Sequence, residues 1–268
     1  MTSLLHAFEL TGAHMRVQLR ARLQFRASFV IELLTTALWM LVYVGFWSVI
    51  FSQISTFQGW TFASVVLFVA FQELFHGLSQ GLFRGALLYY HFIHTGRLET
   101  SLTRPIDARL SAIALNVEPY QLIRSAVMFG LFTVFAVQLG AAFSLPHLLL
   151  GILTVLLAAV GKALFGLCVN YIAFWWSNVD ALHEVLGTFD HFLRVPLNVL
   201  PSTLQLFFTF GLPYMFAATF PALLMGGEFP LRGILMALFG LAAALGGLFV
   251  LQEVLWRVGL RRYDGRGG

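Results

Sequence analysis

Six long apolar runs constrain the fold of this 268-residue chain more than any motif does. A transmembrane helix needs about 20 mostly apolar residues. A soluble domain would carry roughly 25% charged residues, whereas only 10% of this chain is charged and 59% is hydrophobic. The pattern predicts an all-α integral membrane protein with six transmembrane helices in a single domain, residues 1–268. The predicted spans are 28–51, 60–83, 116–140, 147–176, 196–222 and 231–256.

The fifth run is interrupted by Gly211, Pro213 and Pro221. Backbone that is broken at membrane depth is tolerated only where protein or a water-filled cavity satisfies its polar groups. We therefore expect 196–210 to form most of the fifth span. Residues 211–230, which also contain Tyr214, should form a re-entrant or surface-lying hairpin on the extracytoplasmic side before the last span.

Basic residues are distributed unevenly among the segments that flank these runs. One alternating set of segments holds 13 of the 16 Lys and Arg residues, whereas the connections 52–59, 141–146 and 223–230 hold none. Because loops rich in Lys and Arg remain in the cytoplasm, we expect both termini and the loops 84–115 and 177–195 to be cytoplasmic.

Residues 1–26 are predicted to form an amphipathic helix that lies in the cytoplasmic interface of the membrane. Arg16 and Arg20 lie on other faces of this helix than its apolar stripe, and a solvated basic extension is the alternative. The stripe consists of Leu5, Phe8, Gly12, Met15, Leu19 and Leu23. Glu9, four arginines and the lack of a small-residue cleavage site argue against a cleavable signal peptide.

Motifs for catalysis, metal binding and nucleotide binding are incomplete. His91 and His94 have a spacing that could present two imidazoles to a metal, but no third ligand is fixed by the sequence. Gly161-Lys162 resembles part of a phosphate-binding loop, yet Ala163 stands where Ser or Thr should bind magnesium. We predict no catalytic residue, no metal site and no cofactor on this chain.

Glu73 and Lys162 are ionisable residues inside predicted spans. Such residues are costly in lipid and normally face the interior of the helix bundle or a water-filled path. Glu73 is a candidate partner of Lys162. A structural ion pair, snorkelling of Lys162 and lining of a transport pathway all remain open.

The polar stretch "HTGRLETSLTRPID" (94–107) follows the second run. Leu98 and Leu102 stand four residues apart, and Pro105 ends any helix at or before Arg104. A short helix with a two-leucine ridge could dock in a groove of a partner protein. A solvated connector is equally compatible with these residues.

Three segments resemble the ABC-2-type transporter permeases of bacteria. The first is "GRLETSLTRP" (96–105), which matches the pattern G-R-L-E-x-x-L-x-R-P after the second span. The second is "FGLPYMFAATFPALLMGG" (210–227), which is similar to the proline-punctuated segment before the last span. The third is "GLRRYDGRGG" (259–268), which is similar to a short terminus that contains Tyr263.

This resemblance implies a permease subunit of an exporter in the bacterial inner membrane, which moves an amphipathic or lipidic substrate across the surrounding lipid. Its partners would be a second permease and two ATPase subunits that bind ATP and Mg, and nucleic acid is not expected. The alternatives are an integral-membrane enzyme acting on lipid head groups and a non-ABC channel or scaffold. The implied coupling residues that touch the ATPase are Gly96, Arg97, Leu98, Glu99, Leu102, Arg104 and Pro105.

Overall fold

A computed structural model of the chain describes residues 12, 15–17, 26–103, 107–176, 187–227 and 229–263. These residues form helices and turns and contain no strand. Five helices are long and apolar enough to cross a membrane, and the number rises to six if one bent pair of helical segments counts as a span. The all-α membrane fold predicted from the six runs is therefore confirmed.

The five long helices correspond to predicted spans one to four and six. The chain's local sequence explains where two of them begin. The Thr61 hydroxyl accepts a hydrogen bond from the Ser64 backbone amide, and the Ser64 hydroxyl accepts one from the Thr61 amide, which forms a capping box. Pro119 occupies the first turn of another helix, where no backbone donor is needed. The helices are α2 (Arg26–Phe51), α3 (Phe62–Leu82), α8 (Pro119–Gln138), α9 (Leu145–Asn170, extended by the 3-10 helix η1, Tyr171–Phe174) and α13 (Leu231–Leu260).

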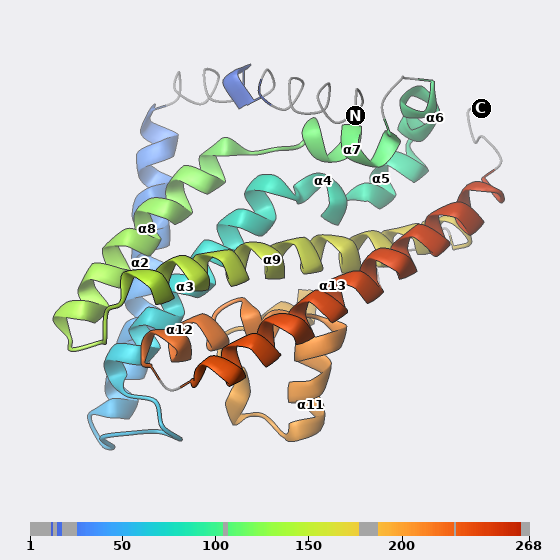
Figure 1. Ribbon diagram of the computed structural model, residues 1–268. Helices are drawn as coiled ribbons and strands as arrows, with labels where there is room; N and C mark the ends of the chain where they lie inside the picture. The colour runs from blue at the N-terminus through green and yellow to red at the C-terminus, as the bar shows by residue number, and fades with distance from the viewer. Residues whose placement is uncertain are drawn as a thin grey trace.

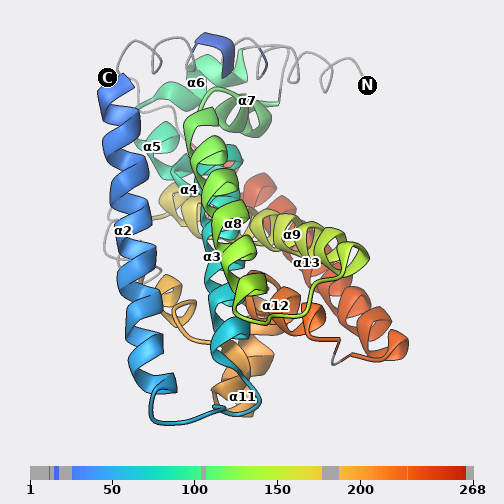
Figure 2. The same cartoon turned by 90° about the vertical axis from the view of Figure 1, so that its left-hand side faces the viewer.

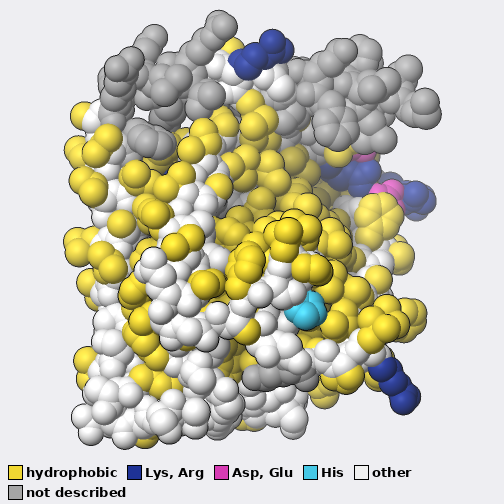
Figure 3. Space-filling model, turned by 60° about the vertical axis from the view of Figure 1, so that its left-hand side comes forward, with side chains coloured by type: hydrophobic (Ala, Val, Ile, Leu, Met, Phe, Trp, Pro, Cys, Tyr) yellow, Lys and Arg dark blue, Asp and Glu magenta, His cyan; other side chains and the backbone are white. Residues whose placement is uncertain are grey.

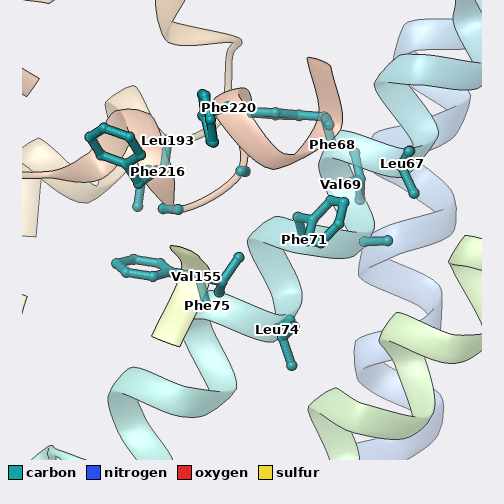
Figure 4. Close-up of a cluster of buried hydrophobic side chains, with 14 of the residues drawn as sticks. Leu67, Phe68, Val69, Phe71, Leu74, Phe75, Val155, Leu193, Phe216 and Phe220 are labelled. Atoms are coloured by element: carbon teal, nitrogen blue, oxygen red, sulfur yellow. The ribbon is translucent and has the colours of Figure 1, made fainter. Parts of the chain in front are cut away.

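Helix α3 lies at the centre of the molecule and packs along α8 (Figure 2). Gly77 and Gly81 on α3 face Ser125 and Leu122 on α8 so closely that a Cβ atom would not fit at either glycine. Small residues allow such close helix packing in membranes. The other side of α3 buries a cluster of aromatic and aliphatic side chains against α9 and the segment before α13 (Figure 4).

Four short helices connect α3 to α8. They are α4 (Arg84–Leu87), α5 (Tyr89–His94), α6 (Arg97–Leu102) and α7 (Ala108–Ala114). They lie at the end of the molecule where α2 begins and α13 ends (Figures 1 and 2). We call this the basic end, because it carries Arg97, Arg109, Arg257, Arg261 and Arg262.

The fifth run is broken, as the glycine and proline residues predict. The segments Ser202–Gly211 and Tyr214–Met225 meet at 85°, and Pro213 lies between them. The helical part is shorter than the predicted range 196–210, since α-helix begins only at Ser202, after two prolines that disfavour helix at the residue before each. The elements are η2 (Leu197–Val199), α11 (Ser202–Leu206), the π-helix η3 (Phe207–Gly211), η4 (Tyr214–Phe216) and α12 (Thr219–Met225).

The outer surface is apolar over the long helices. Trp39 on α2 is 71% exposed and Phe239 on α13 is 77% exposed. In Figure 3 hydrophobic and uncharged atoms cover most of the visible face, and the few Lys, Arg, Asp and Glu side chains lie near its margins. Such a surface suits a lipid environment, and this chain is a multi-pass membrane protein.

Most of the predicted interfacial helix lies outside the described residues. Only residues 12, 15–17 and 26 of the range 1–26 are described. Arg104 and Pro105 also lie outside the described residues.

Candidate functional site at the basic end and on the polar face of α3

Helix α6 forms most of the predicted polar helix in the 84–115 loop. Gly96 precedes it with φ 70°, a left-handed conformation that costs glycine little because it has no Cβ atom. This sharp turn separates α6 from α5 and sets its direction. The glycine of the sequence pattern therefore has a conformational role at the start of α6.

The two leucines of α6 do not form a shared ridge. Leu98 is fully buried inside the protein, whereas Leu102 is 44% exposed. The prediction that both dock on a partner is wrong for Leu98, because the neighbouring short helices already cover that side chain. Leu102, together with the exposed residues Arg97, Thr100 and Thr103, forms the accessible side of α6.

Leu98 belongs to a buried cluster that joins the short helices to the ends of two long ones. We call it the basic-end cluster. Tyr89, Tyr171 and Trp256 form its aromatic centre, with ring centroids 5.3 to 5.9 Å apart. The buried residues of the cluster are Ala86, Tyr89, Ile93, Leu98, Ala108, Ala112, Ala163, Leu167, Tyr171, Ala173 and Trp256.

Arg109 ties α7 to α13. Its guanidinium donates to both carboxylate oxygens of Asp107 and to Glu253 Oε2 at 2.6 Å, and it lies over the Trp256 ring at 5.2 Å. Burial alone would raise the pKa of Asp107, but the hydrogen bonds from Arg109 and the backbone outweigh it and hold the pKa below its usual value. Asp107 also caps α7 by accepting from the Arg109 and Leu110 amides.

Tyr263 packs against the basic-end cluster, which includes Leu98 of α6. Its ring meets Phe174 edge-on with centroids 5.9 Å apart. Burial, followed by the nearby Glu99 carboxylate, raises the pKa of the Tyr263 hydroxyl. A displacement of α6 would therefore be transmitted through this packing to Phe174 at the end of α9 and to Tyr263 after the end of α13.

Polar residues follow one face of α3 through the middle of the protein. Gln72, His76, Gln80 and Arg84 recur at four-residue steps, so they lie above one another on the helix and its continuation into α4. They line two cavities, and His76 borders both. This spacing within the second run was the sequence signal that could have identified the polar face.

The first cavity, of about 410 Å³, lies between α3, α9 and the bent segment. Lys162 donates to both oxygens of Asp190 at 2.9 and 2.8 Å, and the Tyr214 hydroxyl donates to the same carboxylate. The Lys162 ammonium also lies 5.5 Å from the centroid of the Phe75 ring. Lys162 therefore pairs with Asp190, and the suggested pairing with Glu73 is not found.

The second cavity, of about 530 Å³, lies between α2, α3 and α8. Glu73 forms an ion pair with Arg124 at 3.1 Å, and Arg124 donates to the Thr36 hydroxyl at 2.7 Å. Three helices are thus linked through polar groups at membrane depth. Arg124 falls within the predicted span 116–140, and nothing in the sequence indicated that it is the partner of Glu73.

The prolines of the bent segment pack against glycines of α9. Pro213 lies on Gly161, and Pro221 lies on Gly151. Tyr214, between the two prolines, is buried and reaches the first cavity. The predicted hairpin residues therefore hold the bent segment against the fourth span and place a hydroxyl beside the Lys162–Asp190 pair.

Comparison with known families agrees with this architecture. A family model described as "ABC-2 family transporter protein" matches residues 37–267. The chain belongs to the ABC-2 family of transporter proteins. Members of this family are the membrane permeases of ABC transporters, so the chain is a transmembrane transport subunit. No curated protein and no solved structure matches it.

Proposed function

We propose that the chain is the permease subunit of an ATP-binding cassette exporter for an amphipathic or lipidic substrate. Two partner subunits bind and hydrolyse ATP with Mg, and a second permease completes the membrane unit. The observation that carries the proposal is the arrangement of α6, which exposes Leu102 at the basic end while Leu98 anchors it to the membrane helices. Family membership supports the same assignment.

The basic end provides a physical route from an ATPase to the membrane. Protein interiors are close-packed, so a displacement at one surface is transmitted to packed neighbours. Leu98 would transmit movement of α6 into the basic-end cluster, and Arg109 would carry it to Glu253 and Trp256 on α13. Because basic segments face the cytoplasm, the ATPase would bind from that side of a bacterial inner membrane.

The cavities support an amphipathic or lipidic substrate. Each places charged or hydrogen-bonding groups next to apolar walls at membrane depth. Ligand pockets usually combine a mostly apolar lining with a few polar groups that fix orientation. A substrate with one polar end and one apolar end would satisfy both kinds of surface.

The coupling role of α6 is tested by Leu102→Ala. Central apolar anchors of an interface contribute about 2 kcal/mol, which corresponds to about 30-fold in affinity. We expect the tagged permease to recover less ATPase in a detergent pull-down and to lose substrate-stimulated ATP hydrolysis. Its melting temperature should be unchanged, because Leu102 is 44% exposed.

Leu131→Ala is the matched control, since Leu131 is 58% exposed on the apolar surface of α8 and far from α6 in sequence. It should retain the ATPase and its activity. Full retention of both by Leu102→Ala and by a Leu102→Asp variant would overturn the coupling role of α6.

A further inference from the structure

The cavity between α2, α3 and α8 has an apolar wall and a polar end. Trp39, Val42 and Phe46 on α2 supply much of the wall, and their side chains are 56 to 71% exposed in the single chain. The polar end contains Glu73 and Arg124. A volume of about 530 Å³ is within the range of pockets that bind small molecules.

Several polar groups at this end are buried but incompletely satisfied. Gln72 Oε1 and Arg124 Nε make no hydrogen bond with any part of the chain that the structure describes. The ion pair between Arg124 and Glu73 leaves Glu73 Oε1 without a well-directed hydrogen bond. Buried polar groups normally have partners, and the three residues that carry these atoms all line the cavity, so this end of it is strongly polar.

The charge of the cavity favours an anion. Glu73 and Arg124 balance one another, whereas Arg194 lines the same cavity and forms no ion pair with a described carboxylate. Arg194 is an exposed residue and lines the cavity together with Tyr43 of α2. Two arginines and one carboxylate therefore line this cavity.

We propose that this cavity binds an amphiphile whose head group has a net negative charge from a phosphate or carboxylate. The anionic group lies against Arg194 at the polar end that Arg124 and Glu73 form, and the apolar chain lies along Trp39 and Phe46 of α2. Arginine suits this role because its planar guanidinium matches the oxygens of phosphate and carboxylate. Binding requires this chain alone. Only the further step, that the bound amphiphile is the exported substrate, rests on the proposed function.

The site is tested by photolabelling of the purified permease in nanodiscs, without ATPase. The nanodiscs contain phosphatidylcholine and a small fraction of a probe lipid with a diazirine on its acyl chain. The probe has either a phosphatidylglycerol or a phosphatidylcholine head group. We expect the phosphatidylglycerol probe to label the α2 peptide that contains Trp39 and Phe46 in preference to the phosphatidylcholine probe.

Arg194→Gln should reduce this preference by about tenfold, as expected for the loss of one charge-assisted contact. Arg232→Gln is the matched control, because Arg232 is an exposed arginine on α13 that does not line the cavity. Both side chains are exposed, and equal melting temperatures will show that both variants fold. Equal labelling by the two probes, or an unchanged preference in Arg194→Gln, would overturn the site.

A second pair of variants tests the apolar wall. Phe46→Ala should reduce labelling, whereas Phe239→Ala, which removes an exposed phenylalanine elsewhere, should not. Inorganic phosphate should compete much more weakly than a soluble short-chain phosphatidylglycerol. Equal competition would show a plain anion site and contradict the proposal. Because no ATPase is present, these outcomes are independent of the Leu102 test of the proposed function.

Discussion

Leu98 and Leu102 illustrate how the fold gives two similar residues different roles. They stand one helical turn apart, yet only Leu98 is enclosed by the neighbouring short helices and the ends of α9 and α13. The i, i+4 spacing predicts that two side chains lie on the same face of a helix. It does not show what covers that face, because the covering residues come from elements up to 158 positions away, such as Trp256.

Leu98→Ala should therefore destabilise the permease itself. Leu→Ala substitutions in a packed core cost about 2–5 kcal/mol, because apolar contacts are lost and a cavity remains. We expect a lower melting temperature in detergent for Leu98→Ala and an unchanged one for Leu102→Ala. If the two variants melted at the same temperature, Leu98 would not anchor α6.

The Lys162–Asp190 pair should show coupled mutational effects. Asp190→Asn leaves the Lys162 ammonium buried without its counter-charge and should cost about 1–3 kcal/mol. This is less than for a fully enclosed pair, because the Asp190 side chain is 40% exposed. Adding Lys162→Met should recover much of the lost stability. Additive losses in a double-mutant cycle, measured by detergent melting, would contradict the pairing.

At the scale of elements, the long helices were predictable because apolar length alone identifies them. Four of the predicted runs match α2, α3, α8 and α13 to within a few residues at most boundaries, and the breaks at Gly211 and Pro213 are confirmed. The chain path around α11 and η2 was not predictable. Those segments are short, and the position of η2 depends on distant contacts: the Trp60 indole donates to Asn198 Oδ1, and the Leu197 amide donates to Thr219 Oγ1. The same limit applies to Asp190, whose approach to Lys162 follows from tertiary structure.

Helix α7 should lose stability in acid through its cap. The pKa of Asp107 is lower in the folded protein than its ordinary value, so the ionised form stabilises the fold. This contribution is fully present above the ordinary pKa of an aspartate and is lost as the pH falls through the lower folded-state value. Asp107→Asn should therefore destabilise the protein at neutral pH, and its difference from the unmodified protein should shrink in acid. A difference that stays constant with pH would contradict the role of Asp107.

At the scale of the whole molecule, the ends of the helices require six crossings. The end of α9 lies at the basic end, where η1 packs against α5, and α13 also ends there. Helix α13 therefore begins at the opposite end (Figure 1). The chain between α9 and α13 must pass once from the basic end to the opposite end, although it contains no long helix. This crossing is complete by Asn198, whose Oδ1 accepts a hydrogen bond from the Trp60 indole beside the α2–α3 turn, so the bent pair Ser202–Met225 begins and ends at the opposite end. With this crossing, the start of α2 and the end of α13 lie on one side.

Cysteine labelling can test this topology with little background, because Cys168 is the only cysteine and is buried. In a Cys168→Ala background, exposed thiols can be placed in the α2–α3 turn by Ser55→Cys and at the start of α11 by Ser202→Cys, and directly after α6 at the basic end by Thr103→Cys. The α2–α3 turn and α11 lie at the opposite end from α6 (Figure 2). Since basic segments face the cytoplasm, a membrane-impermeant maleimide should label Ser55→Cys and Ser202→Cys in intact cells. Thr103→Cys should be labelled only after permeabilisation. Labelling of Thr103→Cys in intact cells would invert the orientation. Protection of Ser202→Cys together with labelling of Ser55→Cys would show that the chain between α9 and α13 crosses the membrane elsewhere.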